Sequence, residues 1–328
     1  MSRPVATMAM RPAALADDLF AHERARLEGL VDLHPDARER FDEADGRLAE
    51  TEILLAGWGC PRLDAEVLAR MPRLRAVLFA GGAAAAVLDT RIAAERGIVF
   101  TNAGEGNAQA VAEYTLGVIL LAGKRAAFAE RLYRERRAHV DREVELRDTG
   151  NYRRVVGLIG ASRIGRRVAE LLRPTDLDVI VYDPYASGAD VAALGARRCG
   201  LDELLALSDI VSIHAPATAE THEMIGAREL ALLRDGATLI NTARGTLLDH
   251  EALRPHVRTG RIDAVLDVTV PEPLPADDEL WDLPNVSLTP HIAGATGSEL
   301  HRLGRDVVDE LERFVHGRAF AYREAVPA

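Results

Sequence analysis

The stretch Val155-Val-Gly-Leu-Ile-Gly-Ala-Ser-Arg-Ile-Gly165 joins a short apolar strand to the start of a helix through a glycine-rich turn. A G-x-G-x-x-G turn between a strand and a helix binds the pyrophosphate of a dinucleotide at the helix N-terminus. Ser162 stands where the motif has its middle glycine, so a Cβ would face the phosphates, although its hydroxyl can itself meet a phosphate. The turn alone leaves a cofactor site and a simple packing turn both open.

The strand predicted next, residues 178–182, favours the cofactor site. It is followed by Asp183, which lies 18 residues after Gly165. A carboxylate in this place accepts hydrogen bonds from both ribose hydroxyls of the adenosine and repels a 2′-phosphate. An exposed acid at a strand end is the plainer alternative. The distance of Asp183 from the glycine-rich turn nevertheless predicts an NAD site, with NAD preferred over NADP.

On both sides of this turn the chain alternates short apolar strands with helical stretches, which is typical of parallel sheets covered by helices. The strands predicted before the turn are residues 5–10, 29–33, 52–56, 76–80 and 98–101. Those predicted from the turn onward are residues 155–159, 178–182, 210–213, 238–242, 264–268 and 285–288. The helical predictions are residues 64–70, a long buried helix at 107–121, an exposed charged arm at 124–147 and an amphipathic helix at 298–316. We therefore expect an α/β fold with two domains.

The composition excludes several classes of partner. The 328 residues carry a net charge of −11, which argues against nucleic acid. The longest apolar stretch, residues 114–122, is too short to span a bilayer. The two cysteines, Cys60 and Cys199, have no metal-ligand spacing, so we expect no metal site and a reduced, cytoplasmic setting.

Three side chains after the glycine-rich turn have the chemistry that reduction of a 2-keto acid requires. Arg244 follows the strand at 238–242, and a guanidinium binds a carboxylate through two parallel hydrogen bonds. His291 can move a proton to and from the carbonyl oxygen, and Glu272 would keep that imidazole protonated and fix its tautomer. A surface arginine and a structural histidine are the plainer alternatives for each residue alone. Asp267, at the end of its strand, would hold the nicotinamide carboxamide or simply cap the strand.

Together these motifs resemble the D-2-hydroxyacid dehydrogenase family, the NAD-dependent dehydrogenases of D-isomer substrates. The matching segments are residues 157–165, 181–185, 214–221, 241–245, 267–275 and 290–294, with Asn102 and residues 107–113 resembling the interdomain helix. The family implies two Rossmann-like domains. A doubly wound NAD-binding domain, residues 103–292, is inserted in a discontinuous flavodoxin-like substrate domain, residues 1–102 and 293–328. It also implies a homodimer joined through the NAD-binding domain by helix 107–121 and its following arm.

The resemblance assigns roles to residues one by one. The catalytic residues are Arg244, Glu272 and His291. The expected cofactor-binding residues are Gly160, Ser162, Arg163, Ile164, Gly165, Asp183, His214, Ala215, Pro216, Thr221, Thr242, Ala243, Arg244, Asp267, His291 and Gly294. The expected substrate-binding residues are Trp58, Gly81 and Gly82, together with Arg244 and His291.

Two loops depart from the family pattern. Residues 80–87 read Ala-Gly-Gly-Ala-Ala-Ala-Ala-Val, where the family often has Gly-x-Gly-x-Asp. Residues 57–61 lack the basic residue of members that handle phosphorylated substrates, which argues against 3-phosphoglycerate. The sequence predicts an NAD-dependent enzyme that interconverts a small 2-keto acid and its D-2-hydroxy acid by hydride transfer, without fixing which acid. A non-catalytic NAD(H)-sensing protein on the same fold is the main alternative. A formate dehydrogenase would not need the His–Glu pair.

Overall fold

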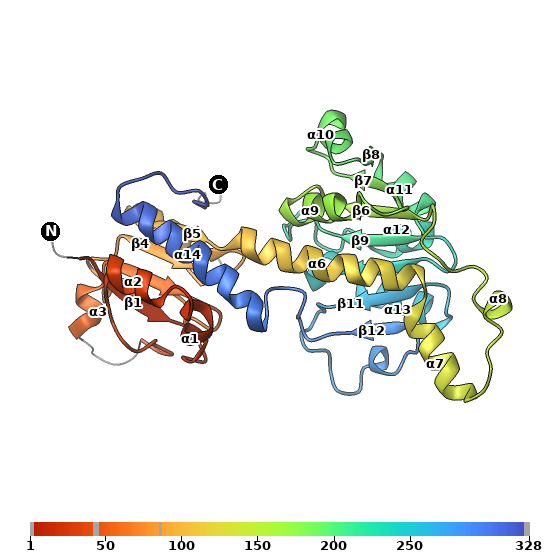
Figure 1. Cartoon of the computed structure of the whole chain (residues 1–328), viewed down its shortest axis with the longest axis horizontal. Helices are drawn as coiled ribbons and strands as arrows, with labels where there is room; N and C mark the ends of the chain where they lie inside the picture. Colours follow the sequence, from red (N-terminus) through yellow and green to blue (C-terminus); the bar gives the residue numbers. More distant parts are fainter. Residues whose placement is uncertain (1–2, 42–45, 85–86, 325–328) are drawn as a thin grey trace. The chain divides into compact units, whose positions relative to one another are not determined.

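The computed structural model describes residues 3–41, 46–84 and 87–324, and it divides the chain into two compact units (Figure 1). The first unit holds Met1–Ala108 and Ala295–Ala328, and the second holds Gln109–Gly294. The predicted boundaries, after residues 102 and 292, lie within six residues of these divisions.

The first unit is built on a parallel sheet of five strands with the order β2-β1-β3-β4-β5, the flavodoxin-like order. Its strands are β1 (Val5–Ala9), β2 (Asp32–Leu33), β3 (Ile53–Ala56), β4 (Ala76–Phe79) and β5 (Val99–Asn102). Its helices are α1 (Leu15–Phe20), α2 (Arg24–Leu30), α3 (Gly46–Glu50), α4 (Ala65–Ala69), α5 (Thr90–Glu95) and α14 (Leu300–Val315), which follows the 3-10 turn η4 (Gly297–Glu299). Every residue of β3 and β4 is buried, as expected at the centre of a parallel sheet covered on both faces.

The second unit is built on a parallel sheet of seven strands with the order β12-β11-β10-β9-β6-β7-β8. Counted from β6, this is the Rossmann order with one further strand. The strands are β6 (Val155–Ile159), β7 (Asp178–Tyr182), β8 (Arg197–Arg198), β9 (Ile210–Ile213), β10 (Thr238–Asn241), β11 (Asp263–Leu266) and β12 (Val286–Leu288). The predicted fold class, two α/β domains of these two kinds, is confirmed.

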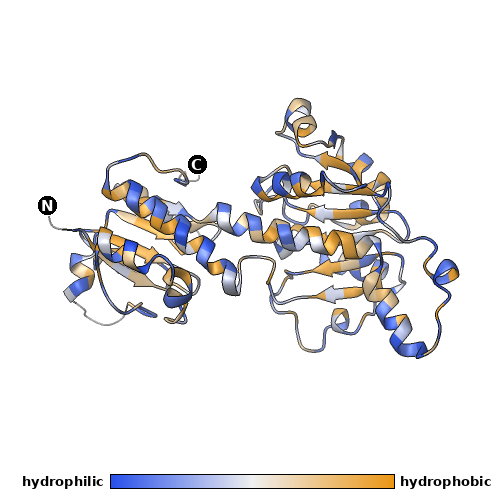
Figure 2. Cartoon of the chain, viewed as in Figure 1, coloured by the Kyte–Doolittle hydropathy of each residue, from blue (hydrophilic) through white to orange (hydrophobic). Residues whose placement is uncertain are grey.

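The helices of this unit cover both faces of its sheet. They are α6 (Gly104–Gly123), which begins in the first unit, then α7 (Ala126–Arg136), α8 (Arg142–Glu145), α9 (Arg163–Leu172), α10 (Gly188–Ala193), α11 (Leu201–Leu207), α12 (Ala227–Leu232) and α13 (His250–Arg258), with the 3-10 turns η2 (Gly245–Leu247) and η3 (Glu279–Trp281). Alternate strand residues enter two separate cores. Val156 and Leu158 of β6 pack with residues of α6 and α9, whereas Ile159 packs with residues of α11, α12 and α13. Figure 2 shows the strands of both sheets as mostly apolar.

The local structure departs from the predictions in three places. Of residues 29–33, expected to be a strand, only Asp32–Leu33 form one, β2. The helix α2 extends to Leu30, because Leu27 is buried on its inner face and Arg24 pairs with Glu28 one turn away. The short edge strand β8 consists of two exposed arginines, so no apolar alternation indicated it. The helix expected over 107–121 is present as α6, but it is not buried along its whole length, since Leu121 is 60% exposed.

The charged arm at 124–147 is helical only in two pieces, α7 and α8. The left-handed residues Arg125 and Arg137, both with φ of 46°, flank α7 and interrupt the helix. No residue of α7 or α8 is buried, as the prediction of an exposed arm requires.

Candidate active site

The glycine-rich turn between β6 and α9 is a cradle that a side chain would fill. Gly160 has φ of +102°, and a Cβ on it would lie 2.8 Å from the backbone nitrogen of Ala215 in the loop after β9. A Cβ on Gly165 would lie 2.0 Å from the carbonyl oxygen of Gly160. Both glycines are therefore required for the close approach of these backbones, at the point between β6 and β9 where the strand order reverses.

Ser162 caps α9. Its Oγ accepts a hydrogen bond from the backbone N–H of Gly165 at 3.3 Å, so the residue that departs from the motif stabilises the helix start. The hydroxyl proton is not used in this bond and is available for a phosphate oxygen. Arg163 and Ile164 form the first turn of α9, where the helix dipole favours an anion.

Asp183, at the carboxyl end of β7, is held by three backbone N–H groups. Its Oδ2 accepts from Ala161 at 2.7 Å, and its Oδ1 accepts from Tyr185 and Ala186, each at 2.8 Å. Burial acts to raise the pKa of this carboxyl, but the three N–H donors and the nearby Arg166 outweigh it and lower the pKa below its usual value. The charged form, which accepts hydrogen bonds and repels a phosphate, is the one that the fold maintains.

The loop after β9 lies against the same turn. His214 is 3% exposed, and within the described part of the chain neither of its ring nitrogens has a hydrogen-bond partner. Burial lowers the pKa of His214 to about 4, so the imidazole is neutral. The loop then passes Ala215 and Pro216 and is closed by the Thr221 hydroxyl, which donates to the carbonyl of Pro216 at 2.6 Å. The glycine cradle, the Asp183 carboxylate and the unpartnered polar atoms of His214 fit a bound dinucleotide.

The three predicted catalytic residues follow neighbouring strands. Arg244 lies after β10, Glu272 after β11 and His291 after β12, and these strands are adjacent in the sheet. The carboxyl ends of parallel strands meet at one edge, where ligands of open α/β sheets bind. The topology thus brings the three loops to one edge of the second unit.

The Asn241 side chain and the close packing of Gly245 hold the Arg244 loop. Asn241 accepts from the N–H of Ala243 at 3.1 Å and donates to the carbonyl of Arg244 at 2.9 Å. A Cβ on Gly245 would lie 2.2 Å from the carbonyl oxygen of Thr269, so only glycine allows this loop to pack against the segment after β11. The guanidinium itself is exposed, and Nη1 donates to the carbonyl of Ala243 at 2.6 Å.

His291 and Glu272 form a pair. The His291 Nδ1 lies 2.7 Å from Glu272 Oε1, and the two side chains are 45% and 44% exposed. His291 has φ of +56°, a left-handed conformation that costs a side-chain residue on the order of 1 kcal/mol or more. Since Nδ1 is directed at the carboxylate, Nε2 is the ring nitrogen left for another partner.

Asp267 supports the His291 loop. Its carboxylate is 1% exposed and accepts from the Thr289 hydroxyl at 2.6 Å and from the N–H groups of Ile292 and Ala293, each at 2.8 Å. The N–H of His291 also donates to the carbonyl of Asp267 at 3.0 Å. The capping role that was the plainer alternative for Asp267 is therefore present. A contact with a nicotinamide carboxamide stays a prediction.

A second support, which no local sequence pattern indicates, holds the loop that carries Glu272. Arg254 on α13 donates through both terminal nitrogens to Asp278, at 2.7 and 2.8 Å, and the Asp278 side chain is 7% exposed. This hydrogen-bonded guanidinium lowers the pKa of Asp278 to about 2. The indole nitrogen of Trp281 donates to the carbonyl of Pro275 at 2.9 Å. The two contacts fasten the far end of the loop that begins after β11.

The remaining predicted cofactor-binding residues are Thr242, Ala243 and Gly294. Thr242 is buried, with its hydroxyl 3.2 Å from that of Thr115, and Ala243 is buried beside it. Gly294 is half-buried at the end of the second unit. Their contacts with a cofactor stay predictions.

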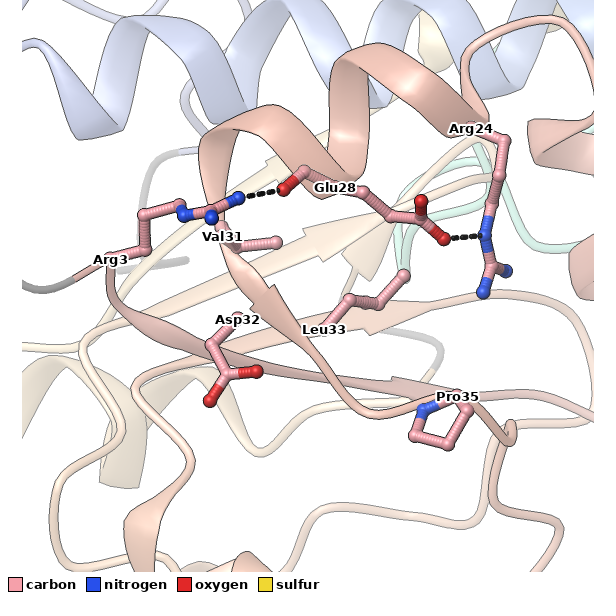
Figure 3. A pocket seen from close by; sticks show the side chains of 7 residues that line it. All are labelled: Arg3, Arg24, Glu28, Val31, Asp32, Leu33 and Pro35. Atoms are coloured by element: carbon pink, nitrogen blue, oxygen red, sulfur yellow. Dashed lines mark hydrogen bonds and ion pairs between the residues drawn. The ribbon is translucent and has the colours of Figure 1, made fainter.

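The expected substrate residues Trp58, Gly81 and Gly82 belong to the first unit, in the loops after β3 and β4. The Gly81 N–H donates to the carbonyl of Phe79 at 2.9 Å, and the contacts of these three residues with a substrate stay predictions. Ala85 and Ala86 of the unusual loop lie outside the described residues. A cavity of about 490 Å³ in the same unit contains none of the predicted site residues; Figure 3 shows its lining, which is Arg3, Arg24, Glu28, Val31, Asp32, Leu33 and Pro35.

Residues 116–293 match the family profile described as the NAD binding domain of D-isomer specific 2-hydroxyacid dehydrogenases. The chain belongs to this family. A D-3-phosphoglycerate dehydrogenase of Mycobacterium bovis is 33% identical over 312 residues, which are 94% of this chain and 58% of that protein. A glyoxylate reductase of Korarchaeum cryptofilum is 34% identical over 258 residues, 78% of this chain and 77% of that protein. The chain thus spans little more than half the length of its phosphoglycerate dehydrogenase relative.

Solved structures agree with this membership in fold and cofactor. The D-lactate dehydrogenase of Aquifex aeolicus, in complex with NAD and lactic acid, superposes with a TM-score of 0.76 at 28% identity, covering 99% of this chain and 100% of that one. NAD is the cofactor of the family, and the cradle between β6 and β9 fits it. Among the described residues, no helix has the length and apolarity needed to cross a membrane. The same residues contain no cluster of three or more His, Cys, Asp or Glu side chains able to hold a metal ion.

Proposed function

We propose that this member of the family is an NAD-dependent enzyme that interconverts a small 2-keto acid and the corresponding D-2-hydroxy acid. The observation that carries the proposal is the 2.7 Å contact between His291 Nδ1 and Glu272 Oε1. It joins the loops after β12 and β11, and the strand β11 lies next to β10, which precedes Arg244. A non-catalytic sensor of NAD would not need a histidine in a strained conformation, paired with a carboxylate and half-exposed.

Each residue has a distinct task in this mechanism. The Arg244 guanidinium binds the substrate carboxylate and polarises the carbonyl oxygen. His291 donates a proton from Nε2 to that oxygen during reduction and accepts it from the hydroxyl during oxidation. Glu272 accepts from Nδ1, which fixes the tautomer and stabilises the imidazolium. When bound, NAD supplies the hydride chemistry at its nicotinamide ring.

Steady-state assays with both cofactors test the proposal. We expect oxidation of NADH with at least one of glyoxylate, pyruvate, hydroxypyruvate and its phosphate ester, and weaker activity with NADPH because of Asp183. Binding of NADH without turnover of any of these acids would point to the sensor. Formate-dependent reduction of NAD would point to the formate dehydrogenase.

The assembly that we propose is a homodimer joined through the second unit. Four large apolar residues of this region are between 60% and 76% exposed: Leu121 on α6, Tyr133 on α7, Val144 on α8 and Tyr152 before β6. Such a group of exposed apolar side chains is typical of a protein contact. Light scattering after size exclusion is expected to give the mass of two chains, and Tyr133→Asp is expected to reduce it to one. A cytoplasmic location is part of the proposal, and Cys60 and Cys199 are both free thiols.

A further inference from the structure

The segment that follows α14, residues 317–324, is fastened along the edge strand β5. Arg323 forms an antiparallel bridge with Thr101, and the N–H of Glu324 donates to the carbonyl of Phe100 at 3.0 Å. Glu310 on α14 is 1% exposed, and its two carboxylate oxygens accept from the N–H groups of Ala321 and Tyr322 at 3.0 and 3.1 Å. These contacts fix the position of Glu324 beside the carboxyl end of β5.

The Glu324 carboxylate joins this segment to the loop after β4. Its Oε1 accepts from the N–H of Ala84 at 2.6 Å and from the side-chain amide of Asn102. The oxygen of the same Asn102 side chain accepts from the N–H of Gly104 at 2.8 Å, so the amide has a fixed orientation. Ala84 is fully buried and Asn102 is 8% exposed. A charge-assisted bond in such a setting is one of the stronger local constraints in a protein.

The loop between Phe79 and Ala84 has two backbone N–H groups that can bind a ligand, those of Gly82 and Ala83. The Gly81 N–H donates to Phe79, and the Ala84 N–H donates to Glu324. Between them, the N–H groups of Gly82 and Ala83 have no acceptor within the described part of the chain, and both residues are exposed. Two successive free N–H groups are a common binding site for an anionic oxygen.

We propose that Glu324 is a positioning residue for substrate binding: by holding the Ala84 N–H it sets the loop so that the Gly82 and Ala83 N–H groups can bind the substrate carboxylate. The inference rests on the proposed function, because it takes the substrate to be a carboxylate and this loop to be its expected binding site in the first unit. Glu324 acts through the geometry of its acceptor oxygen. Its negative charge contributes nothing to the binding of an anion, so a glutamine in its place keeps the function.

Kinetics of Glu324→Ala and Glu324→Gln test this role in the full-length protein. For the best 2-keto acid, Glu324→Ala is expected to raise KM about tenfold and to leave kcat within a few-fold, because it removes binding shared by the ground and transition states. Glu324→Gln is expected to have a KM no higher than that of the wild type. The matched control is Glu52→Ala. It removes an ion pair with Arg75 at the amino ends of β3 and β4, whereas the loop lies at the carboxyl end of β4.

Two further measurements separate positioning from loss of folding. The dissociation constant of NADH, followed by its fluorescence, is expected to stay unchanged in all three variants. Hydrogen exchange of the peptide that contains Ala84 is expected to accelerate in Glu324→Ala alone. An unchanged KM in Glu324→Ala, a raised KM in Glu324→Gln, or a loss of NADH binding together with the raised KM would each overturn the inference. Failure of the wild type to turn over any 2-keto acid would instead overturn the proposed function.

Discussion

Two loops of this molecule, after β12 and after β4, are each held by a carboxylate, but the two carboxylates come from different parts of the chain. The loop after β12 carries His291 and is held by Asp267, a carboxylate at the end of the neighbouring strand, 25 residues from the Ile292 N–H that it binds. The loop after β4 carries Gly82 and is held by Glu324, a carboxylate 240 residues away from the Ala84 N–H that it binds. In both, a carboxylate accepts backbone N–H groups and leaves other groups free for a ligand.

The two loops also differ in the groups that they present to a ligand. The loop after β12 is held by three hydrogen bonds to one buried carboxylate, and it presents a side chain in a strained backbone conformation. The loop after β4 presents only backbone N–H groups and is held by one carboxylate oxygen at its end. We therefore expect perturbation of the first loop to impair proton transfer and perturbation of the second to impair binding.

The largest effect is expected from Arg244→Ala. Losing a bidentate pair with a carboxylate removes two charge-assisted hydrogen bonds, each worth about 1.5–3 kcal/mol, so kcat/KM should fall about 10³-fold. Arg244→Lys keeps the charge but not the planar fork and should recover only part of this loss. Steady-state kinetics on one keto acid decide the matter, and a variant with near-normal kcat/KM would remove Arg244 from the site.

Asp267→Ala should destabilise the loop after β12 itself. It leaves the N–H groups of Ile292 and Ala293 without their acceptor, and unsatisfied buried donors cost about 1–3 kcal/mol each, so the free energy of unfolding should fall by about 3 kcal/mol. Urea denaturation measures this loss. Asp267→Asn, which keeps one acceptor oxygen, should be affected less, and equal stability of all three proteins would contradict the supporting role.

Glu272→Gln should slow turnover without removing the hydrogen bond to His291. Glutamine can still accept from Nδ1 but no longer stabilises the imidazolium, so we expect kcat to fall about 10- to 100-fold. Steady-state kinetics with the best 2-keto acid measure this loss, and a kcat equal to that of the wild type would show that Glu272 does not act on His291.

The smallest effect concerns the support of the Glu272 loop. The pKa of Asp278 is lowered to about 2 by Arg254, so its contribution to the free energy of unfolding, about 2 kcal/mol, is present above about pH 4 and is lost as the pH falls from about 4 to about 2. Urea denaturation at pH 5 and pH 3 should therefore show a smaller loss of stability in Arg254→Met than in the wild type. An equal loss in both proteins would contradict this assignment.

The parts of the fold that could be predicted are those with a local pattern. The strands β6, β7 and β9 were predicted with their observed bounds, because apolar runs end in glycine or in polar residues there. The pairing of His291 with Glu272 was also predictable, since both follow neighbouring strands of a parallel sheet. The edge strand β8 has no apolar residue, so periodicity could not reveal it.

The parts that could not be predicted depend on contacts between distant segments. The sequence does not indicate that the Asp267 carboxylate accepts from the N–H groups of Ile292 and Ala293, because this depends on the path of residues 289–293. The sequence likewise does not indicate that the Gly81 N–H donates to the carbonyl of Phe79. Nothing in the sequence around Glu324 or Ala84 indicates that the two residues meet.

Turnover by His291→Asn tests the central claim most directly, because asparagine keeps a polar side chain but cannot exchange a proton near neutral pH. We predict that kcat for the best 2-keto acid falls 10²- to 10⁴-fold, about the contribution of a general acid, while the dissociation constant of NADH is unchanged. Turnover near the wild-type rate would contradict the assignment of His291 as the proton donor and, with it, the division of tasks between the two loops.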